Sequence, residues 1–227
     1  MELDGGKVIE ARTKEIAYAR DKEVWKRVTR QEANRKGWKI IGTRWIDINK
    51  GDDERPVYRS RLVGKEYNTG EIDGIFASTP PVEELRYLLH RAATVEKNEH
   101  GKVMEKVIMV NDVSRAFFEA TATRQICIEI PEEDKTEEDR KKDNVGLLLK
   151  SLYVTRAAAI NWQEEVAKQM STWGFKRGKY NPCLYYHPQW KVETLIHGDD
   201  FVSVGEEALL KKMERKMTER FEIKTKW

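Results

Sequence analysis

The stretch of residues 193–205 constrains the fold more than any other part of this chain. Two apolar runs, 194–196 and 201–204, flank the sequence His-Gly-Asp-Asp. Val, Ile, Phe and Thr favour strands, whereas Gly and Asp favour tight turns. The pattern therefore predicts a β-hairpin that carries the adjacent carboxylates Asp199 and Asp200 at its tip. A solvated turn with no chemical role would give the same local pattern.

A third carboxylate makes a chemical role the better interpretation. Asp112 ends another apolar run, residues 107–112. Apolar strands that each end in Asp can bring three carboxylates to one edge of a sheet, where they repel one another unless hard cations neutralise them. Two Mg²⁺ ions about 3.5–4 Å apart catalyse in-line phosphoryl and nucleotidyl transfer. We expect such a pair of ions here, with Mn²⁺ as a possible substitute.

Composition excludes several other classes of protein. The 227 residues suffice for one large domain or two small lobes, and the net charge of +3 only weakly favours a polyanionic partner. The two cysteines are far apart and form no Cys-x-x-Cys motif, so a structural zinc site is not expected. The first residues contain no apolar signal segment, and no run approaches the roughly 20 apolar residues of a membrane span. We expect an intracellular protein, without a distinction between cytoplasm and nucleus, and no membrane partner.

The periodicity of the remaining segments predicts an α+β fold. Helices are expected at 13–33, 82–97 and 156–173, and strands at 38–48 and 57–65. The second of these strands brings Arg59, Arg61 and Lys65 to one face, where they could bind phosphates or be ordinary solvated side chains. The charged run 132–144 is expected to be a solvated loop. The order of elements predicts an antiparallel sheet with helices on one face.

Several motifs in this order resemble the reverse transcriptase domain of copia-type LTR retrotransposons. The resemblance extends from residue 25 to residue 224. It includes I-G-T-R-W-I at 41–46, Y-R-S-R-L-V-G-K at 58–65, D-V-S-R-A-F-F at 112–118, L-K-S-L-Y at 149–153 and the Asp-Asp pair in the hairpin. One block alone would be weak support, but this many in register are a specific signal.

The resemblance implies the fingers and palm of a right-hand polymerase, with RNA-directed DNA polymerase activity. It implies a charged lead-in at 1–22, a fingers-like part at 23–95 and a palm part at 96–227 that is truncated before the thumb and RNase H regions. The partners would be an RNA or DNA template with its primer, dNTPs and the rest of a retroelement polyprotein. The chain would then be a fragment of that polyprotein.

The resemblance also implies roles for nine residues that share one task, nucleotidyl transfer. These are Asp112, Asp199 and Asp200 as catalytic ligands of two Mg²⁺ ions, Lys224 as general acid, and Arg59, Arg61, Lys65, Val113 and Phe117 as substrate-binding residues. Phe117 would exclude a ribose 2′-hydroxyl, and the Val113 carbonyl would be a further metal ligand. Phe117 as a core residue and Lys224 as a surface lysine remain equally open.

Three departures from the family pattern keep two other functions open. Val154 replaces a glycine, Ala157 replaces a glutamine, and His197-Gly198 replaces Tyr-Val before the aspartates. A β-branched residue is strained if the turn at Val154 requires φ > 0. The chain could therefore be an inactive remnant that keeps the fold and binds nucleic acid. Another two-metal enzyme, such as a nucleotidyl cyclase, is disfavoured by the basic hairpin.

Overall fold

The computed structural model describes residues 3–52, 54–67, 77–97, 101 and 103–227. The chain divides into two compact units, each built from two separate segments. Unit 1 contains residues 1–75 and 117–162, and unit 2 contains residues 76–116 and 163–227. Two helices, α4 (Ala116–Glu119) and α6 (Ala158–Thr172), include residues of both units.

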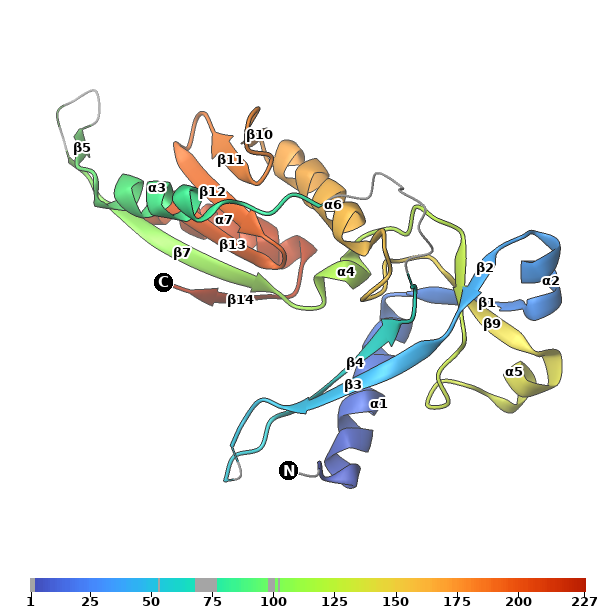
Figure 1. Cartoon of the computed structure of the whole chain (residues 1–227). Coiled ribbons are helices and arrows are strands. Elements are labelled where there is room, and N and C mark those ends of the chain that lie inside the picture. Colours follow the sequence, from blue (N-terminus) through green and yellow to red (C-terminus); the bar gives the residue numbers. More distant parts are fainter. Residues whose placement is uncertain (1–2, 53, 68–76, 98–100, 102) are drawn as a thin grey trace. The chain divides into compact units, whose positions relative to one another are not determined.

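Unit 1 combines a four-stranded sheet, a separate hairpin and the helices α1, α2 and α5 (Figure 1). The strand order of the sheet is β1-β9-β8-β2, and the hairpin pairs β3 with β4. The elements are α1 (Gly5–Asp21), β1 (Trp25–Thr29), α2 (Arg30–Arg35), β2 (Lys39–Ile41), β3 (Thr43–Asn49), β4 (Tyr58–Gly64), β8 (Ile126–Ile128), α5 (Glu137–Lys142) and β9 (Asn144–Leu148).

The helix expected at 13–33 is wrong, because two helices and a strand occupy this region. The Asp4 side chain caps α1 by accepting a hydrogen bond from the Lys7 backbone N–H. After α1 ends, Glu23 adopts a positive φ of 50°, and β1 follows. Strand β1 pairs antiparallel with β9 and buries Trp25. Tertiary pairing thus overrides the weak helical periodicity of this polar segment.

The strand expected at 38–48 is interrupted at Gly42. Residues before the glycine form β2, which pairs parallel with β8, and residues after it form β3, which pairs antiparallel with β4. Gly42 accepts a hydrogen bond from the Lys65 N–H, which joins the base of the hairpin. The strands and α1 enclose a core that includes Ile16, Ile41 and Leu62.

The charged run 132–144 is not the solvated loop that its composition predicted. It contains α5, whose capping box joins Thr136 and Asp139. The carboxylate of Asp139 is buried and accepts hydrogen bonds from Arg27 and Asn144 as well as Thr136. Asp139 of this charged run therefore forms an internal ion pair with Arg27, which lies far away in the sequence, on β1.

Unit 2 is built on a six-stranded antiparallel sheet with the order β10-β11-β12-β13-β7-β14. A short hairpin, β5-β6, lies outside this sheet. The elements are α3 (Val82–Ala93), β5 (Glu96–Lys97), β6 (Val103–Met104), β7 (Lys106–Val113), β10 (Lys176–Arg177), β11 (Leu184–His187), β12 (Val192–His197), β13 (Asp200–Glu206), α7 (Glu207–Arg220) and β14 (Ile223–Lys226).

Helices α3 and α7 cover opposite faces of this sheet (Figure 1). Leu88 of α3 packs with Leu195 and Val204 on one face. On the other face, the Met213 sulfur of α7 lies 3.8 Å from the Thr194 hydroxyl and 3.7 Å from the Ser203 hydroxyl. Alternate residues of β12 and β13 are thus buried on both sides, so helices cover both faces rather than one.

The α+β class with an antiparallel sheet is confirmed, and the arrangement is consistent with a reverse-transcriptase-like fold. Among the described residues, no helix is both long enough and apolar enough to cross a membrane.

Candidate active site

The tip of the β12-β13 hairpin is a two-residue turn. Gly198 and Asp199 connect His197, the last residue of β12, to Asp200, the first of β13. Gly198 has φ +62°, which glycine adopts without the steric cost of a side chain. Glycine therefore suits this turn, where the resemblance predicted valine.

A row of polar residues crosses four neighbouring strands at this edge of the sheet. His197 pairs with Asp200, Asp200 pairs with Asp112 on β7, and Asp112 pairs with Lys224 on β14. Directly opposite residues project from the same face of an antiparallel sheet. The Val113 N–H donates a 2.9 Å hydrogen bond to the Asp199 carbonyl, so β7 also holds the turn.

The carboxylates of this row are close enough to affect one another. The pKa of Asp200 is raised above its ordinary value, first because part of the water around the carboxylate is lost, and next because Asp199 and Asp112 lie nearby. His197 opposes this shift and lowers the pKa. Two neighbouring negative charges thus disfavour a third, as expected for a site whose charge a bound cation would balance.

The oxygen donors suit a hard cation, but they do not form a closed cage. Among the described residues, no group of three or more His, Cys, Asp or Glu side chains is arranged to hold a metal ion. The backbone pairing brings Asp112 and Asp200 to one face, while Asp199 lies in the turn. Carboxylates are the ligands that Mg²⁺ prefers, and Mg²⁺ usually keeps several waters and binds through one or two of them. The donor set therefore fits Mg²⁺.

The three basic residues expected to bind phosphate belong to unit 1. On β4, Ser60 faces α1, because its hydroxyl donates to Asp47, which also accepts from Arg12 of α1. Strand alternation brings Arg59 and Arg61 to the opposite face, and Lys65 directly follows the last residue of the strand. Their structural environments differ, since Lys65 is exposed whereas the other two are half-buried.

Arg61 has the most distinctive environment of the three. Its Cζ lies 5.1 Å from the centre of the Tyr153 ring, and its buried Nε has no hydrogen-bond partner within the described residues. A buried donor without a partner costs free energy, so this nitrogen has an unused capacity to donate a hydrogen bond. Tyr153 was not expected as a site residue. The sequence contains the Leu-Tyr motif, but it does not show which side chains contact Tyr153 in the folded chain.

Phe117 also packs on Tyr153. The two ring centres are 5.1 Å apart, with an interplanar angle of 77°. Phe117 is half-buried, whereas the next residue, Phe118, is fully buried in the core of unit 1. Phe117 and the basic face of β4 thus belong to unit 1, and the row of carboxylates belongs to unit 2.

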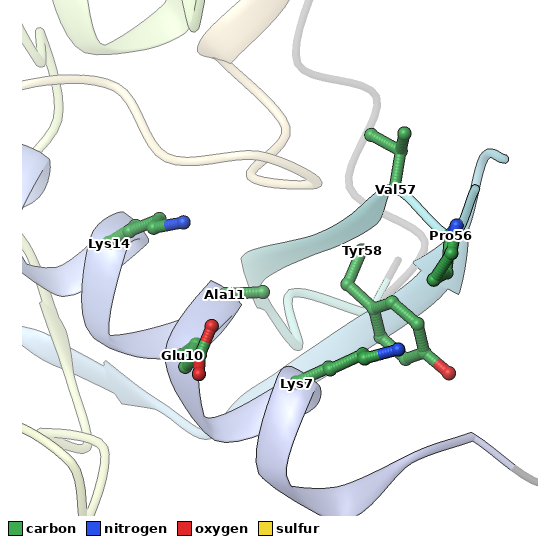
Figure 2. A pocket seen from close by; sticks show the side chains of 7 residues that line it. All are labelled: Lys7, Glu10, Ala11, Lys14, Pro56, Val57 and Tyr58. Atoms are coloured by element: carbon green, nitrogen blue, oxygen red, sulfur yellow. The ribbon is translucent and has the colours of Figure 1, made fainter.

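A surface pocket of about 340 Å³ lies between α1 and the start of β4, apart from these residues (Figure 2). Lys7, Glu10 and Lys14 of α1 line one side, and Pro56, Val57 and Tyr58 line the other. The Lys7 ammonium lies 5.8 Å from the centre of the Tyr58 ring. None of the nine expected site residues lines this pocket.

Comparison with known families gives a match over residues 22–226, to the family described as reverse transcriptase (RNA-dependent DNA polymerase). The chain belongs to this family. Membership supports RNA-directed DNA polymerase function in general, with a nucleic acid template and primer and dNTPs as partners and a divalent metal as cofactor.

Two residues of this reverse transcriptase domain, both near Tyr153, differ from the residues that the resemblance predicted. Val154 has φ +64°, so the turn does require the conformation that glycine adopts most easily, and its side chain is 57% exposed. Ala157 is buried just before α6, where glutamine was expected. The first departure leaves strain in the turn, and the second removes a side chain that could hydrogen-bond.

Proposed function

We propose that the chain is the reverse transcriptase domain of a copia-type LTR retrotransposon and transfers nucleotides from dNTPs to a primer 3′-hydroxyl. The observation that carries this proposal is the row in which Asp200 lies opposite Asp112 and Asp112 lies opposite Lys224. The family match and the motif order support the assignment. The wider context would be a retroelement polyprotein, with residues 23–95 as its fingers-like part and 96–227 as its palm.

Asp112 and Asp199 would hold two Mg²⁺ ions, with Asp200 and the Val113 carbonyl assisting. When bound, the two ions lower the pKa of the primer hydroxyl and neutralise charge on the triphosphate. Loss of water around the carboxylate, and then repulsion by Asp199 and Asp112, raise the pKa of Asp200, and this repulsion supports a site of this kind. Asp200 also holds the register of the hairpin on β7.

The remaining site residues would bind the nucleotide and transfer a proton. The primer 3′-hydroxyl loses its proton to water, its oxygen forms a bond to the α-phosphorus of the dNTP, the bond to the bridging oxygen breaks, and pyrophosphate leaves. Lys224 would donate its ammonium proton to that leaving oxygen. Arg61 and Lys65, with Arg59, would bind the triphosphate, and the partnerless Nε of Arg61 supports this role. Phe117 would lie against the sugar and exclude a 2′-hydroxyl.

The test is primer extension on an RNA template by the purified chain with Mg²⁺ or Mn²⁺. The control is the double variant Asp199→Asn/Asp200→Asn, which removes two carboxylate charges with little change in shape. Extension by the wild type alone supports the proposal. Extension by both would refute the assignment of the carboxylates.

A second candidate is an inactive remnant that retains the fold. The strained turn at Val154 and the loss of the glutamine at Ala157 favour it. A folded wild type that does not extend a primer, together with a Val154→Gly/Ala157→Gln variant that does, would identify these two residues as the cause.

A further inference from the structure

One aromatic ring contacts two residues that the proposed function assigns to the nucleotide. The Tyr153 ring lies under the guanidinium of Arg61, at 5.1 Å from Cζ to the ring centre, and it meets the Phe117 ring edge-on at 5.1 Å between centres. All three residues belong to unit 1, so their mutual geometry is fixed within one compact body.

Tyr153 is itself held from two further directions. Its ring packs against the fully buried Phe118, at 5.5 Å between centres and 65° between planes. Its carbonyl accepts a 2.9 Å hydrogen bond from the Gly64 N–H, on the same strand as Arg61. An anchored ring can fix the side chains that pack on it, whereas a mobile one could not.

We propose that Tyr153 is a positioning residue that sets the distance between the triphosphate contact of Arg61 and the sugar contact of Phe117. This inference rests on the proposed function. The cation–π contact restricts the guanidinium to one face of the ring, and the edge contact restricts rotation of Phe117. Discrimination against a 2′-hydroxyl depends on where the Phe117 ring stands relative to the bound nucleotide, and Tyr153 determines that position.

The competing explanation is that Tyr153 only packs in the core. The ratio of rNTP to dNTP incorporation distinguishes a packing role from a positioning role. If Tyr153 only stabilises the core, its replacement lowers the amount of active protein and affects dNTP and rNTP incorporation equally. If Tyr153 positions Phe117 and Arg61, its replacement changes the ratio of kcat/KM for the rNTP to kcat/KM for the dNTP. A ratio of kcat/KM values does not depend on the fraction of protein that is active.

The experiment measures single-nucleotide incorporation of a dNTP and its rNTP by the full chain and four variants. Tyr153→Phe keeps the ring, and we expect a ratio close to that of the wild type. Tyr153→Met keeps a long apolar side chain but loses both ring contacts. For this variant we expect rNTP use to rise about tenfold relative to dNTP use, with KM for dNTP affected more than kcat. Phe117→Ala should raise the ratio in the same direction.

Tyr18→Met is the matched control, because Tyr18 packs on Phe118, at 6.2 Å between ring centres. It tests the loss of an aromatic side chain from the same core, and its ratio should match the wild type. If Tyr153→Met does not fold, Tyr153→His replaces it, since the smaller ring contacts Phe117 less and its protonated form repels Arg61.

An unchanged ratio in a folded Tyr153→Met or Tyr153→His variant, with an active wild type, overturns this inference and leaves the proposed function intact. A wild type that neither incorporates nor binds dNTP overturns the proposed function, and the inference with it. The activity and dNTP binding of the wild type therefore distinguish the two failures.

Discussion

The Gly64 N–H donates a 2.9 Å hydrogen bond to the carbonyl of Tyr153, and this bond joins β4 to the turn that precedes α6. The next residue, Val154, has φ +64°. The turn therefore keeps a left-handed conformation although its residue is β-branched. The surrounding hydrogen bonds fix a backbone conformation that the side chain disfavours.

Replacing Val154 with glycine should stabilise the chain. The left-handed conformation costs a non-glycine residue about 1–2 kcal/mol, and the exposed side chain of Val154 contributes little burial in return. We expect Val154→Gly to raise the free energy of unfolding by about 1 kcal/mol. Urea titration measures this change. Val95→Gly is the control, because Val95 is 71% exposed without a positive φ, and it should not stabilise the chain.

Replacing Gly198 with valine should destabilise the central hairpin through the backbone alone. A Cβ at this position would meet no atom within 4 Å, so no clash contributes. The positive φ of 62° should cost about 1–2 kcal/mol in Gly198→Val. Asn tolerates this conformation better, so Gly198→Asn should lose less. Equal losses in the two variants would contradict a backbone origin, and thermal unfolding compares them.

Replacing Asp199 with asparagine should abolish nucleotide incorporation while the fold persists. The substitution removes a metal-binding charge with little change in volume, and we expect a loss of at least about 100-fold in kcat. Mn²⁺ binding, followed by electron paramagnetic resonance, should weaken in parallel. Glu214→Gln, on α7, is a control that removes a charge elsewhere. Incorporation unchanged in Asp199→Asn would contradict the site assignment.

The ion pair between Asp139 and Arg27 should make stability depend on pH. Burial alone would raise the pKa of Asp139, but hydrogen bonds from Asn144, Thr136 and Arg27 outweigh it and hold this pKa below its ordinary value. A lowered folded-state pKa contributes stability above the unfolded pKa of about 4, and this contribution is lost as pH falls toward the folded pKa. Asp139→Asn should cost about 2 kcal/mol at pH 7 and progressively less below pH 4.

Glu138→Gln supplies a matched control for this prediction on the same helix. Glu138 pairs with Lys142, but both side chains are mostly exposed, so its loss should cost about 0.5 kcal/mol or less. Urea titrations of both variants at pH 7 and pH 3 make the comparison. A cost for Asp139→Asn that stays constant over this range would show that the carboxylate charge is not responsible.

The central hairpin was predictable because its signal is local. Short apolar runs and the Gly-Asp turn lie within thirteen residues, and their periodicity fixes which residues alternate. The pairing of Asp112 with both Asp200 and Lys224 was not predictable from periodicity alone. It depends on register between strands that are distant in sequence. The apolar runs that end in Asp predicted that the carboxylates meet at one edge of a sheet, whereas only the family resemblance added Lys224.

In other parts of the chain, partners that are distant in sequence determine the burial and the contacts of a side chain. The Thr136-x-x-Asp139 signature of a helix start was present in the charged run, but the buried Asp139 carboxylate also accepts hydrogen bonds from Asn144 and from the distant Arg27 on β1. Tyr153 likewise lay in a visible motif, and its contacts with Arg61 and Phe117 come from tertiary structure. Local patterns specify elements, whereas the assignment of a side chain to core or site requires its neighbours.

The interleaving of the two units along the chain governs the order in which a ribosome can complete them. The unit 1 sheet needs β8 and β9, so its core cannot close until residues near 150 have left the ribosome. By then the first segment of unit 2, including β7, has already been synthesised and waits for β12 and β13. Neither unit can be excised as one continuous piece. During synthesis, both units are therefore incomplete at the same time.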